Sequence, residues 1–214
     1  ANGLHMATRP YQRGDPGLQA ETSRNLDVSL RKHSGSSTFE VTAFHNRVDN
    51  YIHARTLDVH EQLRLVQYTQ GDASFNGLEA QVRHRLNANL DVTLFGDAVR
   101  ARLEQAEGNR NLPRIPAHRF GTRLGMHWQS WHGELEWYRV ARQQHIADFE
   151  TTTPGYNMAN LRLAYDGRFG ATAYQLFARL NNLANELAYN HASFIKDAAP
   201  LTGRNLTVGL RLSF

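Results

Sequence analysis

The last twelve residues, Gly203 to Phe214, read GRNLTVGLRLSF. One side of this stretch, drawn as an extended chain, is wholly apolar and carries Leu206, Val208, Leu210, Leu212 and Phe214. A period of two predicts a β-strand with one apolar face and one polar face. Such a strand fits a half-buried sheet, and it also fits a wall between lipid and water. The remaining sequence has to decide between these two environments.

Composition limits the classes of protein that remain. Hydrophobic residues make up 41% of the 214 positions, and the mean hydropathy is −0.56. No window approaches the roughly 20 apolar residues of a membrane-spanning helix, which excludes a helical membrane protein. The chain has no cysteine, so disulfides and thiolate metal sites are excluded. It opens on Ala1 without an initiator Met or a signal segment, and we expect a processed chain or a fragment.

The basic residues are almost all arginine. The net charge is +4, and Lys32 and Lys196 are the only lysines among 24 basic residues. A basic chain suggests nucleic-acid binding, but that function usually gathers its cations on one helix or arm. Here the arginines are spread singly, and many lie on the polar phase of alternating segments, as do Arg83, Arg123 and Arg211. This pattern argues against nucleic acid and favours the water-filled side of a barrel.

Nine alternating segments are joined by connections that are short and long in turn. The short ones fall near 33–36, 87–89, 130–133 and 166–170, and the long ones near 1–21, 48–61, 104–117, 146–155 and 184–203. Several segments reach about 10 residues, the span of a tilted transmembrane strand. The order predicts an all-β, antiparallel up-and-down transmembrane β-barrel with short periplasmic turns and longer outer loops.

Two further features bear on the barrel. Trp128, Trp131 and Trp137 gather near one short turn, as expected of an aromatic girdle at the membrane interface. The strand count is odd, so the first and last strands of a simple meander would run the same way, whereas bacterial barrels have even numbers. We therefore expect about nine strands of a larger barrel.

Several motifs resemble one known family. Its carboxy-terminal pattern is matched, in order, by Asn181-Asn182-Leu183, Tyr189, Pro200, Gly203-Arg204 and the terminal Phe214. Upstream, RGDPGLQAETSRNLDVSLR (13–31) resembles a strand entry of the family, with Asp15 where Asn is usual, and FEVTAFHNRVDNYI (39–52) and ASFNGLEAQV (73–82) resemble its next two strands. The chain is thus similar, over essentially its whole length, to the TonB-dependent outer-membrane receptors.

This resemblance implies a location, partners and a function. Residues 1–214 would form the carboxy-terminal portion of a barrel of about 22 strands in the bacterial outer membrane, with the plug domain absent from this sequence. The receptor would import a scarce nutrient, energised by the TonB complex through the missing amino-terminal region. Phe214 resembles the terminal residue recognised by the barrel-assembly machinery. No resident cofactor and no enzymatic activity are implied.

The cargo is expected to be a metal ion, zinc first, or a metal complex. ANGLH (1–5) and NHASFIKD (190–197) resemble segments of the metal-uptake receptors in this family, and both lie in predicted outer loops. Imidazole is a good ligand for Zn²⁺, and carboxylates can complete the shell. We predict His5, His191 and Asp197 as metal ligands. Other candidates map to the same outer half, namely His53, His60, His118, His145, Asp58 and Glu61.

Four alternatives stay open. A ferric-siderophore or haem receptor of the same family could stack its ligand on Tyr11, Tyr51 or Tyr68 near the rim. A passive porin would need no plug or coupling segment. A soluble β-barrel or sandwich binder would pack the apolar phase inside a core. A barrel enzyme such as a lipase would need a nucleophile, base and orienting acid in one place, and no motif joins them.

Overall fold

A computed structural model describes residues 2–4, 10–60, 63–105 and 107–214. Its strands, in chain order, are β1 (Asn2–Leu4), β2 (Pro10–Arg13), β3 (Thr22–Lys32), β4 (Ser37–His60), β5 (Leu63–Arg85), β6 (Leu90–Leu103), β7 (Arg119–Trp128), β8 (Trp131–Val140), β9 (Tyr156–Phe169), β10 (Thr172–Asn181) and β11 (Asn205–Ser213). Among these described residues, no helix is long and apolar enough to cross a membrane.

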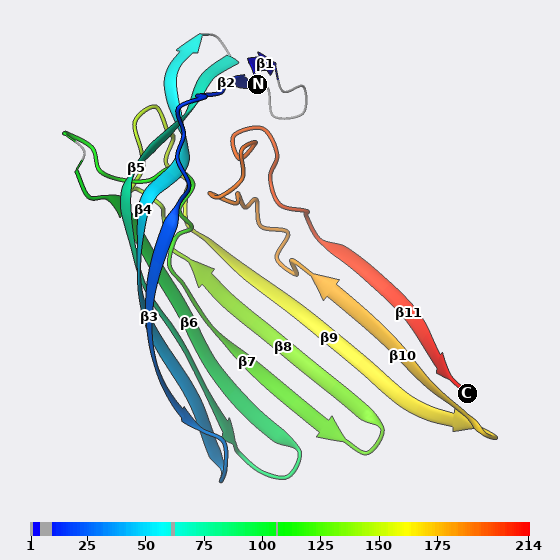
Figure 1. The fold of residues 1–214 in the computed structure, drawn as a ribbon. Coiled ribbons are helices and arrows are strands. Elements are labelled where there is room, and N and C mark those ends of the chain that lie inside the picture. Colours follow the sequence, from blue (N-terminus) through cyan, green and yellow to red (C-terminus); the bar gives the residue numbers. More distant parts are fainter. Residues whose placement is uncertain (1, 5–9, 61–62, 106) are drawn as a thin grey trace.

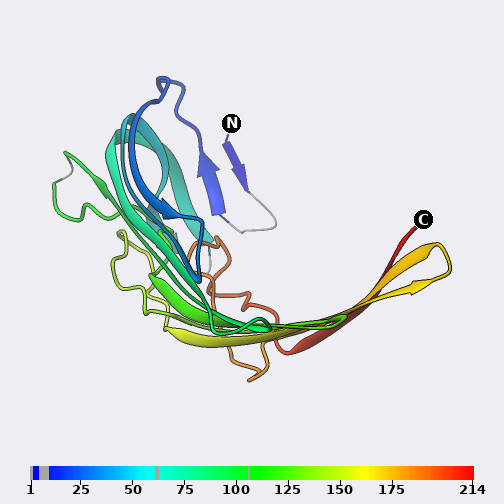
Figure 2. The same ribbon diagram turned by 90° about the horizontal axis from the view of Figure 1, so that it is seen from below.

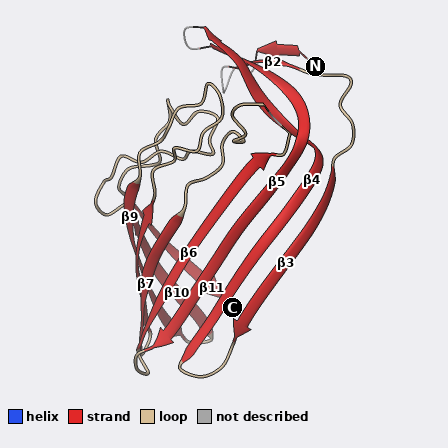
Figure 3. Cartoon of the chain, turned by 90° about the vertical axis from the view of Figure 1, so that its left-hand side faces the viewer, coloured by secondary structure: helices blue, strands red, loops and turns tan. Residues whose placement is uncertain are grey.

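The nine long strands, β3 to β11, form one antiparallel meander. Each pairs with the next strand along the chain, from β3 with β4 to β10 with β11 (Figure 1). The sheet is curved, as Figure 2 shows from below. The long loops gather at one end, called here the outer end, and the short turns at the other (Figure 3). The predicted all-β meander is therefore confirmed.

One face of this sheet is apolar and uncovered. Leu26, Leu94, Leu135 and Leu210, taken from four strands, are 45–64% exposed. The buried hydrophobic residues form only small clusters, such as Ala73 with Ala101 and Leu112, and Tyr156 with Met158 and Ala188. A sandwich would hide the alternating leucines between two sheets. The exposed apolar face excludes that alternative and fits contact with lipid.

Two predicted loops contain strands. Residues 1–21 were expected to be a loop, but they include β1 and β2, and β2 pairs in parallel with β5 from Arg64 to Gln67. The polar stretch 48–61 was also expected to be a loop, yet β4 continues to His60 and pairs with β5. Polar side chains on both faces concealed this extension. The extension forms without a continuous apolar face, because its backbone groups pair across the hairpin, and only some of its residues, such as Val48 and Ala54, are buried.

The turns near the opposite end are tighter than predicted. The turn expected at 130–133 is confined to Gln129 and Ser130, because Trp128 pairs directly with Trp131. Trp137 lies further up β8, opposite Thr122, so the three tryptophans do not share one turn. Strand β8 ends at Val140 instead of residue 145, and β9 extends to Phe169, into the turn expected at 166–170.

Both ends of the meander are edges. Within the described residues β3 pairs only with β4, and β11 only with β10. The two edge strands run in the same direction, from the outer end towards the turns (Figure 1). They are therefore unsuited to close an antiparallel barrel on each other.

Aromatic rings lie over glycines on the neighbouring strand. Phe44 is directly opposite Gly77, and Phe177 is directly opposite Gly209. The three atoms nearest to a Cβ placed at Gly209 all belong to the Phe177 ring. These glycines therefore make room for large side chains on the polar face of the sheet.

We expect Gly209→Ala to lower the unfolding temperature of the protein on heated electrophoresis gels. The added methyl group forces Phe177 from its place, and overpacking of this kind costs about 1–3 kcal/mol. Gly3→Ala is the control, because a Cβ at Gly3 meets no atom within 4 Å. In a Phe177→Ala background the Gly209 substitution should cost little, and an equal loss there would contradict the account.

Candidate functional site

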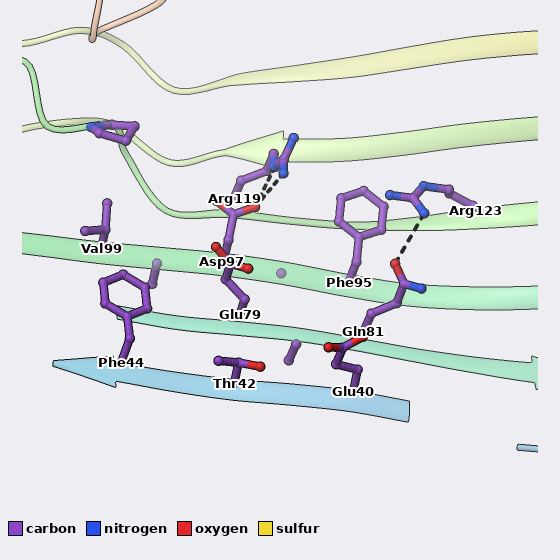
Figure 4. A pocket seen from close by; sticks show the side chains of 14 residues that line it. Glu40, Thr42, Phe44, Glu79, Gln81, Phe95, Asp97, Val99, Arg119 and Arg123 are labelled. Atoms are coloured by element: carbon purple, nitrogen blue, oxygen red, sulfur yellow. Dashed lines mark hydrogen bonds and ion pairs between the residues drawn. The ribbon is translucent and has the colours of Figure 1, made fainter. Parts of the chain in front are cut away.

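The polar face carries arginine–carboxylate pairs that join neighbouring strands. The five pairs are Arg31–Glu40, Arg83–Asp91, Arg119–Asp97, Arg123–Glu136 and Arg162–Glu134. Arg83 donates two hydrogen bonds of 2.9 Å to the two oxygens of Asp91. In Figure 4 the Arg119 side chain on β7 reaches Asp97 on the neighbouring β6, and Arg123 on β7 reaches across β6 to Gln81 on β5. Ion pairs thus connect neighbouring strands across this polar face.

This face is hollowed in two places. One hollow of about 660 Å³ is lined by Glu40, Glu79, Phe95 and Arg119, among others. A second, of about 470 Å³, is lined by Arg83, Arg123 and Arg211, the three arginines predicted to face the inside of a barrel. The three arginines therefore lie on the same, polar face of the sheet.

Three loops, 104–118, 141–155 and 182–204, lie at the outer end, and hydrogen bonds from two buried side chains stabilise them. Gln143, 5% exposed, donates from its amide to the carbonyls of Ile115 and Pro116, which links loop 141–155 to loop 104–118. Asn182, 1% exposed, bonds to Glu186 and Thr202 and so holds both ends of loop 182–204. These side chains hold the outer loops in a defined arrangement.

A buried group of Glu150, His191 and Lys196 joins two of these loops. The exposed fractions of their side chains are 7%, 3% and 1%. The Lys196 ammonium donates to the Thr151 carbonyl and lies 3.3 Å from Nδ1 of His191. Because an ammonium only donates, Nδ1 accepts, and the ring hydrogen lies on Nε2. That Nε2 is 3.2 Å from Oε1 of Glu150, although the pair is not aligned as a hydrogen bond.

Burial and hydrogen bonding act against each other in this group. Burial raises the pKa of Glu150, but the close approach of His191 and the hydrogen bonds from the backbone N–H groups of Ala147 and Arg114 outweigh this effect, so the pKa is lowered. Burial also lowers the pKa of Lys196, while Glu150 counteracts this effect. Removing one partner from a buried ion pair leaves an uncompensated charge, so the two loops depend on one another.

The predicted metal ligands have different surroundings. His5 lies outside the described residues. His191 is 4% exposed, and its ring nitrogens face Lys196, Thr153 and Glu150. Asp197 accepts from Arg64 and, at 2.6 Å, from Thr151. No three His, Cys, Asp or Glu side chains converge on a metal position among the residues that the structure describes.

The other outer histidines are spread along the outer end, except that His118 and His145 line one small pocket together. His53 and His60 are on the projecting part of β4, His118 just precedes β7, and His145 is in loop 141–155. Glu61 lies outside the described residues. Between the β4–β5 ribbon and the loops is a hollow of about 630 Å³, lined in part by His53, Arg55, Arg64, Arg114 and Phe149.

Sequence reasoning missed Glu150, Lys196 and Asn182. The sequence held one signal for the lysine, because Lys196 is one of only two lysines beside many arginines. Asn182 belongs to the Asn-Asn-Leu motif identified in the sequence. Its backbone φ is 53°, and its side chain bonds to Glu186 and Thr202, so that it connects the two ends of loop 182–204. Only the folded loop reveals the function of either residue.

Comparison with known proteins defines the class of this fold. The family model described as "TonB dependent receptor-like, beta-barrel" matches residues 1–183. The chain is similar to the copper transporter OprC, with 19% identity, a TM-score of 0.80 and coverage of 94% of this chain and 33% of that one. It is also similar to the FrpB iron transporter of Neisseria meningitidis, with 15% identity, a TM-score of 0.68 and coverage of 94% of this chain and 33% of that one. The ferric citrate transporter FecA matches with 19% identity, a TM-score of 0.69 and coverage of 89% of this chain and 31% of that one.

The match over most of its length shows that this chain belongs to the TonB-dependent receptor-like β-barrel family. This is a family of receptors and transporters, in agreement with the expectation that the chain is not an enzyme. The chain spans about a third of the length of the solved structures that it matches.

We predict that Glu150→Gln loosens loops 141–155 and 182–204. The substitution leaves Lys196 buried without its carboxylate, which costs about 3–5 kcal/mol. Limited proteolysis of the purified receptor should then cut these loops sooner, and adding Lys196→Met should restore most of the protection. Because the pKa of Glu150 lies below its ordinary value of 4.5, the wild-type protection should persist at pH 5 and fall only as that lowered pKa is crossed.

Glu107→Gln is the matched control, since Glu107 is exposed on loop 104–118. Equal cleavage rates for the wild type and the Glu150 variant would show that the buried group does not hold the loops.

Proposed function

We propose that residues 1–214 are the carboxy-terminal portion of the barrel of a TonB-dependent receptor in the bacterial outer membrane. The exposed apolar face opposite a polar, ion-paired face carries this proposal, because that contrast suits lipid on one side and a watery lumen on the other. The two edge strands, which run the same way, support the presence of further strands in the complete barrel, about 22 in all. A plug domain would occupy the lumen beside Arg83, Arg123 and Arg211.

The transported ligand is a scarce metal ion, zinc first, or a metal complex. The spread of histidines and carboxylates along the outer end supports this cargo, since such groups bind borderline metal ions. The similar structures named above are described as transporters of copper, iron and ferric citrate. His5, His191 and Asp197 remain the proposed metal ligands. For His191 to bind a metal, Lys196 must move away from its Nδ1 atom.

A ferric siderophore or haem is the second candidate, and the hollow at the outer end favours it. Arg55, Arg64 and Arg114 line that hollow, and the Arg114 guanidinium lies 3.9 Å from the centre of the Phe194 ring. Cations beside aromatic rings suit an anionic, partly aromatic chelate better than they suit a bare metal ion.

Two partners complete the proposal. The TonB complex would supply energy through the amino-terminal region of the receptor, which precedes this barrel portion. The barrel-assembly machinery would recognise Phe214, whose side chain is fully exposed at the end of β11.

Uptake of radioactive zinc and of ferric siderophore by cells that produce the receptor tests this function. We expect zinc uptake at low micromolar concentration that disappears when the TonB complex is deleted. A His5→Ala, His191→Ala double variant should lower it at least about tenfold, a loss typical of removed metal-binding contacts, and a His33→Ala variant on the turn before β4 should not. Uptake that continues without TonB would point to a passive porin, and uptake of the iron chelate alone would identify the second candidate.

A further inference from the structure

The hairpin of β7 and β8 places two histidines side by side on the polar face. His127 and His132 are direct cross-strand partners, one pair away from the two-residue turn. Residues directly opposite each other in an antiparallel pair have Cβ atoms about 4.5–5.5 Å apart, close enough for their side chains to meet. Both histidines line the hollow of about 470 Å³ and are half-exposed, so a solute can reach them. They lie far along the strands from the outer loops, near the turn end of the sheet.

The two rings meet through the same nitrogen. Nδ1 of His127 and Nδ1 of His132 are 3.2 Å apart. The ring planes are inclined at 67°, so the rings are not stacked. Each Nε2 instead faces a carboxylate on another strand. The Nε2 of His132 is 2.8 Å from Asp166, and the Nε2 of His127 is 3.6 Å from Asp91.

The carboxylates determine which ring nitrogens are available. An ionised carboxylate only accepts, so Nε2 of His132 carries a hydrogen and donates it to Asp166. The Nδ1 atom of a neutral His132 is then a bare lone pair aimed at His127. A hydrogen on Nδ1 of His127 can bridge the two Nδ1 atoms. If that Nδ1 carries no hydrogen, a cation can bind both lone pairs instead.

The spacing suits a metal ion. Two nitrogen ligands of a tetrahedral zinc ion, each bonded at about 2.0–2.1 Å, lie about 3.3–3.4 Å apart. The observed 3.2 Å is close to that separation. Histidines that bind metals almost always donate their second ring N–H to a carboxylate or carbonyl, which fixes the tautomer and orients the ring. Asp166 stands in that position for His132. Asp91, bonded to Arg83, lies 3.6 Å from Nε2 of His127, just beyond hydrogen-bond distance.

The local charges permit a cation here. Arg83 is bonded to Asp91, and Arg162 to Glu134, so these two arginines are neutralised by their partners. Arg123, which also lines the hollow, is paired with Glu136. Arg179 and Arg211 line the hollow as well, and Asp166 adds a carboxylate directly beside His132. The carboxylates nearest the two imidazoles, Asp166 and Asp91, therefore offset part of the positive charge at the pair.

We infer that His127 and His132 form a binding site for one borderline divalent transition-metal ion, such as Zn²⁺ or Cu²⁺, on the inner wall near the turn end. The two Nδ1 atoms bind the ion, water fills the remaining positions, and the hydrogen between the rings moves to Nε2 of His127, on the side of Asp91. Asp166 positions the His132 imidazole. This site is separate from the outer loops and does not rest on the cargo proposed above.

Copper serves as the probe, because Cu²⁺ bound to imidazoles gives nitrogen splitting in its electron paramagnetic resonance spectrum. The full receptor, purified in detergent, should bind one Cu²⁺ at this wall with the splitting of two imidazole nitrogens, and excess Zn²⁺ should displace it. His132→Gln and His127→Gln should each abolish that signal and weaken the site at least about tenfold. Asp166→Asn should weaken it by roughly 10- to 100-fold while leaving both nitrogens in the spectrum.

His84→Gln is the matched control, because His84 lies on the apolar phase of β5 and bonds to Ser37. It should retain the signal. Unchanged copper binding in both hairpin variants would overturn the inference, as would a wild-type receptor that shows no two-nitrogen signal at micromolar copper. If a hairpin variant does not assemble, the His5→Ala, His191→Ala receptor decides, since it lacks the two histidines proposed to bind the cargo: it should keep the two-nitrogen signal, and loss of the signal there would overturn the inference. Active uptake by a receptor that lacks this signal would overturn the wall site and leave the proposed function intact.

Discussion

The structure depends on one constraint, which is that backbone N–H and C=O groups beside an apolar environment must find partners within the protein. The nine-strand meander meets this constraint from β3 to β11, since each strand pairs along its length with the next. With the backbone satisfied in this way, Leu94, Leu135 and Leu210 can remain exposed on one face without a second sheet to cover them. The same constraint is not met along the free edges of β3 and β11, whose backbone N–H and C=O groups have no partner strand among the described residues. Pairing with further strands would satisfy it.

The polar face meets a different demand. Arginines and carboxylates alternate across neighbouring strands, so that most charges on the wall have an opposite charge within reach. Pairs of this exposure contribute little to stability one by one. Their effect is a polar wall on which most charges have an opposite charge nearby. Glycines opposite Phe44 and Phe177 make room on this face for the few large rings that it carries.

Much of this fold could be predicted from the sequence, because alternation along a strand is a local property. The alternation from Leu206 to Leu212 predicts one apolar and one polar face of the sheet. The regular order of short and long connections predicts the up-and-down meander. The β4 extension could not be predicted in this way, since its apolar and polar residues between Val48 and His60 do not alternate. The ion pairs were also hidden, because the partner of Arg123 is fixed by the register between β7 and β8.

The outer loops show the same limit more strongly. His191 was identified as a candidate from its residue type and its neighbours in the sequence, but the burial of Glu150 and Lys196 around it follows from two loops that meet only in the fold. The histidine pair at the β7–β8 turn shows the opposite case. The spacing of five residues between His127 and His132 is visible in the sequence. A two-residue turn at Gln129 and Ser130 makes them direct cross-strand partners, and the position of that turn is known only from the structure.

The central claim is that the two faces of one sheet meet lipid and water. The chain has no cysteine, so single cysteines can be introduced into it at Leu94, on the apolar face, and at Gln81, on the polar face. In receptor embedded in lipid vesicles, a membrane-soluble maleimide should label the Leu94→Cys variant and a charged, water-soluble one should label the Gln81→Cys variant. Equal labelling of both positions by the water-soluble reagent would contradict the account.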